Sequence, residues 1–212
     1  MDDALAEDRR ALESAESWLL GRFVCPASRL GELGSDYRTL TVVVDAELPV
    51  DDRIVSVEAR EPVPFDGDVY VELPLDDSLS KRLDELQARG LRAKVRCGGD
   101  SVPHRADLAR FIRGCRSRGL VFKATAGLHH AYPTNGEHGF LNLLAAVIFD
   151  EREAALTENE EEAFRLDEGE FAWRGFRAGP EELAAARRDL FSGIGSCSFT
   201  EPVEELERLG ML

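Results

Sequence analysis

Lysine is scarce in this sequence. Only three of its 26 basic residues are lysines, and the other 23 are arginines. Such a bias is typical of a GC-rich genome or of adaptation to high salt, and it acts against lysine throughout the chain. Lys94 and Lys123 nevertheless lie within apolar segments. Because arginine does not replace a compact amine with a tunable pKa, these two positions indicate a specific need for lysine.

The chain also lacks an excess of positive charge and a long apolar run. Its net charge of −15 argues against binding to nucleic acid or to an anionic membrane surface, since both require basic residues. No stretch reaches the roughly 18 apolar residues of a membrane span. The acidic N-terminus has no basic region ahead of an apolar core, so no secretory signal is expected. We therefore expect an acidic, cytoplasmic protein.

Cysteines are few and widely spaced. Cys25, Cys97, Cys115 and Cys197 form no CxxC pair, so neither disulfides nor a structural zinc site built from cysteines is expected. Cys197 alternates with two serines in an apolar, glycine-containing segment. A buried thiol is the usual fate of such a cysteine, and we expect it here.

Helical and strand patterns alternate along the chain. Apolar spacing predicts helices over residues 4–20, 76–90, 101–119, 138–156, 179–191 and 202–210. Strand patterns occupy residues 22–28, 39–46, 53–60, 68–74, 92–99 and 120–127, and a further strand is expected over 193–199. Two short runs about "DEG" at 167–169 indicate a hairpin. With no long linker, residues 1–212 are expected to form one α/β domain.

The number of strands favours a barrel. Six strands precede residue 128, one lies near 171–173 and one over 193–199, which gives the eight strands of a (β/α)8 barrel. However, the connections 47–52 and 61–67 are too short for the crossover helices that parallel neighbours usually need. We therefore predict a reduced or irregular TIM-like barrel. The alternative is an α+β mixed sheet with flanking helices, in which these strands pair antiparallel.

Polar residues on the predicted strands fall on one face. Side chains two residues apart on a strand share a face, which pairs Ser56 with Glu58, Tyr70 with Glu72, Lys94 with Arg96, and Lys123 with Thr125. Charges would be costly against the helix layer of a barrel. We therefore expect the glutamates, lysines and Arg96 to converge inside the barrel, near the carboxyl ends of its strands. Structural ion pairs are the alternative role for these residues.

Histidines concentrate after the Lys123 strand. His129, His130 and His138 lie within ten residues, whereas His104 lies apart, near a helix start. The first two are candidate acid–base groups near neutral pH, and His138 is a candidate substrate-binding residue. Together with Glu137 they could hold a divalent metal, but the spacing does not match a HExxH helix. Hydrogen bonding within the loop is the alternative role.

The segment "GIGSCSF" precedes the last predicted helix. Small residues and backbone N–H groups ahead of a helix commonly bind phosphate or carboxylate, so Gly195, Ser196 and Ser198 are candidate substrate-binding residues. Tight packing of the last strand would explain the same small residues.

Several segments resemble a family of uncharacterised bacterial proteins. They are "GRFVCPASRL", "VYVELP", "AKVRCGG", "FKATAGLHH", "HGFLNLL" and "GSCSFTEPVEEL", which cover most of the chain in this order; "FKATAGLHH" is the most specific. The resemblance implies a further N-terminal stretch and a helix between the second and third strands, and we expect neither of them in this chain. The lysines on adjacent strands are also similar in layout to Schiff-base aldolases of the deoxyribose-phosphate type, although no diagnostic motif accompanies them.

Two classes of function fit these features. The first is an enzyme acting on a small anionic metabolite, a lyase or isomerase with a strand lysine as amine, or else a metal-dependent hydrolase using the 129–138 loop. The second is a non-catalytic binding or regulatory protein on a degenerate barrel. A homodimer is expected, since an incomplete barrel leaves edges to cover. The candidate catalytic residues are Lys123, Lys94, Glu72, His129 and His130, and the candidate substrate-binding residues are Arg96, Thr125, Gly195, Ser196, Ser198 and His138.

Overall fold

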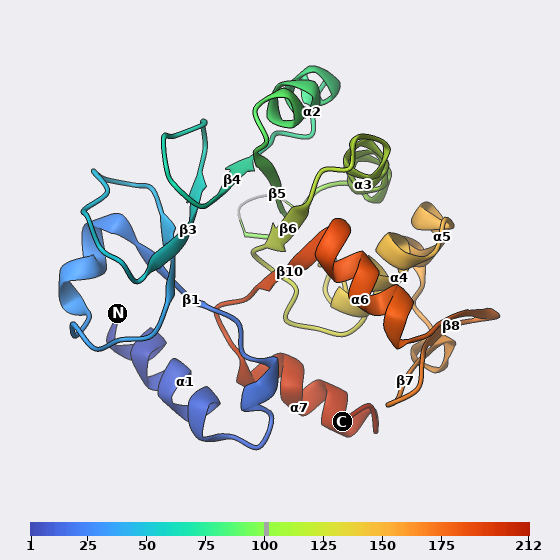
Figure 1. The fold of residues 1–212 in the computed structure, drawn as a ribbon. Coiled ribbons are helices and arrows are strands. Elements are labelled where there is room, and N and C mark those ends of the chain that lie inside the picture. Colours follow the sequence, from blue (N-terminus) through green and yellow to red (C-terminus); the bar gives the residue numbers. More distant parts are fainter. Residues whose placement is uncertain (100–101) are drawn as a thin grey trace.

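The computed structural model describes residues 1–99 and 102–212, and its main element is a seven-stranded parallel sheet (Figure 1). Strand order along the sheet follows the sequence, β1-β2-β3-β4-β5-β6-β10, and every neighbouring pair is parallel. The strands are β1 (Phe23–Pro26), β2 (Leu40–Val43), β3 (Ile54–Ala59), β4 (Asp68–Glu72), β5 (Arg92–Arg96), β6 (Phe122–Thr125) and β10 (Phe191–Gly195).

The sheet curls into a half-barrel that does not close (Figure 1). Within the described residues, β1 and β10 are its two edges and do not pair with each other. The predicted α/β class is confirmed, but the count of eight barrel strands is wrong. The expected strand near 171–173, β8 (Phe171–Trp173), instead forms a small antiparallel sheet with β7 (Phe164–Leu166) and β9 (Phe176–Ala178). Its hairpin with β7 is the one predicted about residues 167–169.

The short connections between early strands do not reverse the chain. β2 and β3 are parallel, as are β3 and β4, although residues 44–53 and 60–67 contain no helix. The antiparallel alternative for these strands is therefore wrong. Parallel neighbours normally need a crossover of a dozen or more residues. Here extended loops make the return, which is why this part of the half-barrel has no helix covering it.

Seven α-helices occur in the described residues. They are α1 (Asp2–Glu13), α2 (Leu79–Ala88), α3 (Arg105–Arg118), α4 (Phe140–Ile148), α5 (Arg152–Thr157), α6 (Pro180–Asp189) and α7 (Thr200–Arg208). Short 3-10 turns occur at Ser17–Leu19 (η1), Ala27–Glu32 (η2) and Glu161–Ala163 (η3). Helices α2, α3 and α6 lie outside the curl, whereas α1 and α7 lie on its open side (Figure 1).

Two predicted helices are shorter than expected. The first ends at Glu13 rather than near residue 20. The long helix over 138–156 breaks into α4 and α5, because Phe149 is extended (φ −93°, ψ 149°) and stacks on Phe171, with ring centroids 5.9 Å apart. Asn142 then ties α4 to the end of α5, donating from its amide to the carbonyls of Ala155 and Glu158. Tertiary packing therefore overrides the local helical pattern.

The two faces of the sheet differ in chemistry. The outward face carries residues such as Val71, Val95 and Phe122, which are at most 1% exposed and pack into the main core under the helices. Phe122 meets Phe111 of α3 edge to face, with ring centroids 5.1 Å apart. The inward face carries the polar residues that alternate with them. Because burial of apolar surface supplies most of the stabilisation, the packing of the outward face against the helices stabilises the fold, and the concave face can carry polar groups.

Candidate active site

The register of the sheet aligns charged side chains on its concave face. Glu72 of β4 pairs with Lys94 of β5, and Lys94 pairs with Lys123 of β6. Paired residues on neighbouring strands point to the same side of the sheet, so these three side chains form a row. Glu58 of β3 lies beside this row, opposite Tyr70. The predicted convergence of the lysines and glutamates on one face is therefore present.

Four of these residues form one ion cluster, which we call the lysine–glutamate cluster: Glu58, Glu72, Lys94 and Lys123. The Lys94 ammonium donates to Glu58 Oε2 at 2.7 Å and lies 3.0 Å from Glu72 Oε2. The Lys123 ammonium donates to the other oxygen of Glu58. One carboxylate thus holds both ammonium groups, and the cluster carries two positive and two negative charges.

The cluster is largely removed from water. The side chain of Glu58 is 3% exposed, that of Lys94 7% and that of Lys123 12%, whereas Glu72 is 24% exposed. Burial acts to raise the pKa of Glu58, but the charges and hydrogen bonds of Lys123 and Lys94 outweigh it, and the pKa lies below its ordinary value. Glu58 is therefore a carboxylate at neutral pH, and it keeps two cations side by side.

Tyr70 links the cluster to a second polar chain. The Lys123 ammonium lies 5.4 Å from the centroid of its ring, within the range of a cation–π interaction. The Tyr70 hydroxyl donates to Ser192 Oγ at 3.1 Å and accepts from Arg92 at 3.1 Å. Arg92 in turn pairs with Asp68 at 2.6 Å. Lys123 therefore contacts the Glu58 carboxylate on β3 and faces the ring of Tyr70 on β4.

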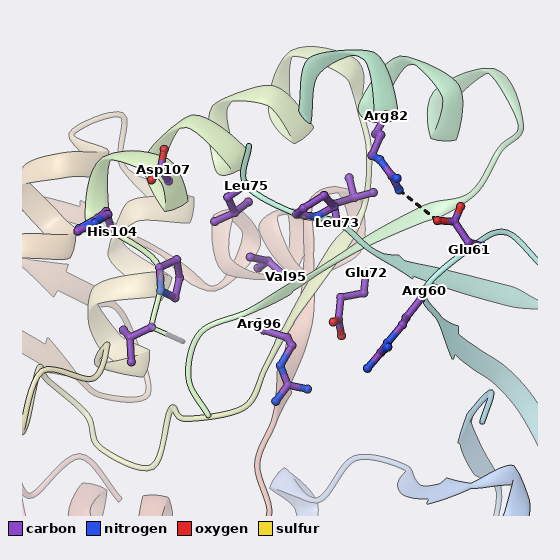
Figure 2. A pocket seen from close by; sticks show the side chains of 13 residues that line it. Arg60, Glu61, Glu72, Leu73, Leu75, Arg82, Val95, Arg96, His104 and Asp107 are labelled. Carbon is purple, nitrogen blue, oxygen red and sulfur yellow. Dashed lines mark ion pairs between the residues drawn. The ribbon is translucent and has the colours of Figure 1, made fainter. Parts of the chain in front are cut away.

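A cavity of about 610 Å³ opens at the carboxyl ends of β3, β4 and β5. Figure 2 shows the Arg60 and Arg96 side chains extending on either side of the Glu72 carboxylate. No hydrogen bond or ion pair joins either guanidinium to another residue in 1–99 or 102–212. Glu72 belongs both to the cavity wall and to the lysine–glutamate cluster, so it connects the two. Predicted residue Arg96 thus lines the same site as Glu72.

The three clustered histidines do not meet at one point. Nδ1 of His129 lies 2.7 Å from Glu201 of α7, and Nδ1 of His130 lies 3.7 Å from Glu205. His138 is 3% exposed, and its Nε2 lies 2.9 Å from the Pro103 carbonyl, in the cavity wall. Burial lowers the pKa of His138 below its ordinary value. Its contact with Pro103 makes His138 a support of the cavity wall rather than a lining residue.

The metal site that the loop sequence allows is not assembled. Within the described residues, no group of three or more histidine, cysteine, aspartate or glutamate side chains could hold a metal ion. His104, expected near a helix start, is the N-cap residue of α3 and is exposed, and it lines the cavity.

The amides ahead of α7 already have an anionic partner. Glu7 of α1 accepts hydrogen bonds from the Phe199 and Thr200 amides, each at 3.0 Å, and from the Ser198 hydroxyl at 3.2 Å. Hydrogen bonds from Arg10 and from the Thr200 backbone lower the pKa of Glu7 to about 2. Apart from Arg10, the donors to this internal carboxylate are residues 198–200, and of the predicted Gly195, Ser196 and Ser198 only Ser198 is among them. Ser198 is therefore not available to a substrate anion in this structure.

The remaining predicted residues lie at the end of the last two parallel strands. Thr125 pairs with Gly195, and a Cβ on Gly195 would lie 3.1 Å from Thr125 Cγ2. The Thr125 hydroxyl is buried and has no hydrogen-bond partner among the residues described. Ser196 Oγ lies 3.4 Å from Nδ1 of His129 and accepts from the Ser198 amide. Close packing of β10 on β6 thus accounts for the small residue at 195.

All four cysteines are free, and one differs from expectation. Cys25, Cys97 and Cys115 are buried, but Cys197 is exposed. The expectation of a buried thiol at 197 is wrong because β10 ends at Gly195, and the chain then leaves the sheet.

The structure adds functional candidates that the sequence did not single out. Arg60 follows β3 directly and shares the cavity with Glu72, but nothing in the sequence separates it from the other 22 arginines. Glu58 was expected on the correct face, yet its central position between two lysines depends on the strand register alone.

No described helix is both long enough and apolar enough to cross a bilayer. No protein-family model matches the chain, and no curated protein or solved structure matches it either.

Proposed function

We propose that the protein is an enzyme of the lyase or isomerase type that acts on a small anionic metabolite with a carbonyl group, using Lys123 as the catalytic amine. The observation that carries this proposal is the sharing of one buried carboxylate, Glu58, by the ammonium groups of Lys94 and Lys123. An amine nucleophile needs a neighbouring group that takes its proton, and Glu58 contacts the Lys123 ammonium directly.

Lys123 is a better candidate for the reacting amine than Lys94. Among the described residues, Lys94 contacts two carboxylates, Glu58 and Glu72, whereas Lys123 contacts only Glu58. The Lys123 side chain is also the more exposed of the two, at 12% against 7%. A substrate therefore displaces fewer interactions at Lys123. Lys94 stays paired with Glu58 and Glu72 and so holds both carboxylates beside the reacting amine.

The first chemical step follows from these contacts. Lys123 gives a proton to Glu58, and its nitrogen attacks the substrate carbonyl carbon; a proton then moves from this nitrogen to the former carbonyl oxygen to form a carbinolamine. Glu58 returns its proton to the carbinolamine hydroxyl, which leaves as water, and a protonated Schiff base remains. That cation withdraws electrons from the neighbouring carbon–carbon or carbon–hydrogen bond. Glu58 and Glu72 are placed to move protons because both carboxylates contact the amines directly.

The cavity provides a place for the anionic part of the substrate. Arg60 and Arg96 border it, and guanidinium groups bind carboxylate and phosphate by paired hydrogen bonds. Glu72 lies between this cavity and Lys94, so the substrate would extend from the arginines toward the lysines.

Reductive trapping tests the proposal. The protein is incubated with borohydride and a panel of small 2-oxo acids and aldehyde or ketone phosphates, and the modified peptide is identified by mass spectrometry. We expect an adduct on Lys123 that is absent from Lys123→Arg, which keeps the charge, and reduced in Arg96→Gln. Lys81→Arg is the matched control, because Lys81 is an exposed residue of α2. Trapping on Lys81 as readily as on Lys123 would refute the proposal.

A non-catalytic binding protein is the second candidate, and the pairing of both ammonium groups favours it. A neutral, internally paired cluster needs no substrate to balance its charge. Calorimetry on Lys123→Arg with the same anionic compounds separates the two. If binding persists unchanged while no wild-type turnover is found, the cavity is a binding site and Lys123 is structural.

A further inference from the structure

A second group of reactive side chains lies beyond the ends of β6 and β10. Sγ of Cys197 lies 3.6 Å from Nε2 of His129. The other ring nitrogen of His129, Nδ1, lies 2.7 Å from Oε2 of Glu201 in α7. The histidine therefore has the thiol on one side and a carboxylate on the other. None of these contacts involves the lysine–glutamate cluster.

The thiol in this group is accessible, and the other thiols are not. Cys197 is exposed, whereas Cys25, Cys97 and Cys115 are buried. Burial raises the pKa of the Cys97 thiol to about 12, so it stays protonated at neutral pH. The His129 side chain is 22% exposed, so the pair faces solvent. A reagent in solution therefore meets one cysteine only, and that cysteine lies beside a base.

The order of these groups is that of an activated nucleophile. A thiol beside a histidine, whose far nitrogen is oriented by a carboxylate, meets the general requirement for nucleophilic catalysis. Carboxylate contact at Nδ1 favours the tautomer with its proton on that nitrogen, which leaves Nε2 free to accept the thiol proton. A lone surface cysteine would have neither feature.

We propose that Cys197 is the nucleophile of a separate acyl-transfer site, with His129 as general base and Glu201 as the residue that positions it. The substrate class is an activated ester or thioester with a small acyl group. This site goes beyond the proposed lysine chemistry and does not depend on it, because it uses neither Lys123 nor Glu58.

The proposed reaction balances without a cofactor. Nε2 of His129 takes the Cys197 proton, the sulfur forms a bond to the acyl carbon, and the ester or thioester bond breaks. The leaving oxygen or sulfur departs with the electron pair and takes the proton from His129. Water then attacks the acyl-cysteine, His129 accepts a proton from that water and returns it to the departing sulfur, and the free acid is released. No atom is oxidised or reduced in either step.

The probe for the test is p-nitrophenyl acetate, whose nitrophenolate release is followed by absorbance while intact-mass and peptide mass spectrometry locate the acetyl group. We expect acetylation of Cys197 in the folded protein and none in Cys197→Ser. Because a general base contributes on the order of 10²–10⁴ in rate, His129→Ala should slow acetylation by about a hundredfold.

Variants at α7 test the positioning role. Glu201→Gln should slow acetylation by about tenfold, and Glu201→Asp should restore most of that loss, which a merely structural residue would not do. Glu204→Gln is the matched control, because Glu204 is an exposed carboxylate of the same helix and should leave the rate unchanged. Circular dichroism establishes that each variant is folded, and His129→Gln replaces His129→Ala if the latter unfolds.

Two results would overturn this inference. One is acetylation of Cys197 at the same rate in the folded wild type, in a folded His129 variant and in the urea-unfolded chain. The other is acetylation confined to Lys81 or the N-terminus, with Cys197 unmodified.

Discussion

Replacing Glu58 by glutamine removes the one carboxylate that both buried lysines share. In Glu58→Gln, Lys94 keeps its contact with Glu72 at 3.0 Å, but Lys123 has no carboxylate left within ion-pair distance among the described residues. Removing one partner of a buried pair costs about 3–5 kcal/mol, because the other charge stays buried and uncompensated. Lys123 is 12% exposed and gains some water, so we expect the lower end, about 3 kcal/mol.

The assay is equilibrium unfolding by urea at neutral pH, with thermal unfolding as a second measurement. For a chain of this size, 1 kcal/mol shifts Tm by about 2–4 °C, so Tm should fall by about 6–12 °C. Glu85→Gln is the control, since Glu85 forms an exposed pair with Lys81 at 3.7 Å on α2 and exposed pairs contribute little.

The stability difference between wild type and Glu58→Gln should depend on pH through the ionisation of Glu58. The folded-state pKa of Glu58 lies below its ordinary value of 4.5, so its stabilising effect is complete above that pH. The effect is lost as the pH falls through the folded value, where the wild-type carboxyl becomes neutral like the glutamine. The stability difference between wild type and Glu58→Gln should therefore shrink in acid.

A double variant tests the cause. In Glu58→Gln/Lys123→Met the uncompensated charge is gone, so about 2 kcal/mol of the loss should return. A Glu58→Gln cost under about 1 kcal/mol, or a double variant less stable than the single one, would refute the electrostatic account of the cluster.

Three further predictions concern other parts of the fold. Glu7→Gln should lower the free energy of unfolding by about 1–2 kcal/mol, because α7 loses its N-terminal cap. In urea unfolding, the wild type alone should lose that stability as the pH falls from 4.5 to about 2, and equal pH profiles for wild type and variant would contradict this. The His138 imidazole should titrate below pH 6.5 in NMR measurements, because burial favours its neutral form, and its contribution to stability should be lost as the pH falls from 6.5. A titration midpoint above 6.5 would contradict this effect of burial on the pKa. Gly98→Ala should lower the free energy of unfolding by about 1–3 kcal/mol, measured as a fall in Tm, because the added Cβ would lie 2.8 Å from the Gly127 Cα. An unchanged Tm would show that the loops move apart to accommodate the methyl group.

Strand alternation predicted the polar face of the sheet correctly. Tyr70 and Glu72, and likewise Lys94 and Arg96, could be assigned to a common face from their spacing, because the two-residue period is a local property of any strand. The end of α2 at Gly90 and the position of Pro180 in the first turn of α6 were also predicted correctly, since both depend on the backbone preferences of single residues.

Other features depended on partners distant in sequence. The helix expected over 138–156 breaks at Phe149 because Phe171 and Trp173 stack on that ring, and no local pattern indicates this. The barrel strand expected near 171–173 joins a separate sheet for the same reason, since the pattern of a strand does not indicate which strands it pairs with. The segment before α7 was expected to bind a substrate anion, and no local pattern indicates that Glu7 of α1 contacts the amides there.

The α/β class, the faces of the strands and the presence of two lysines where the composition disfavours them follow from local patterns in the sequence. Three features depend on contacts between distant segments: Glu58 lies between those lysines, the described sheet stays open between β1 and β10, and His129 contacts both Cys197 and Glu201. Periodicity and residue preference act over a few residues, whereas register, closure and contacts between loops are set by packing between segments up to 193 residues apart.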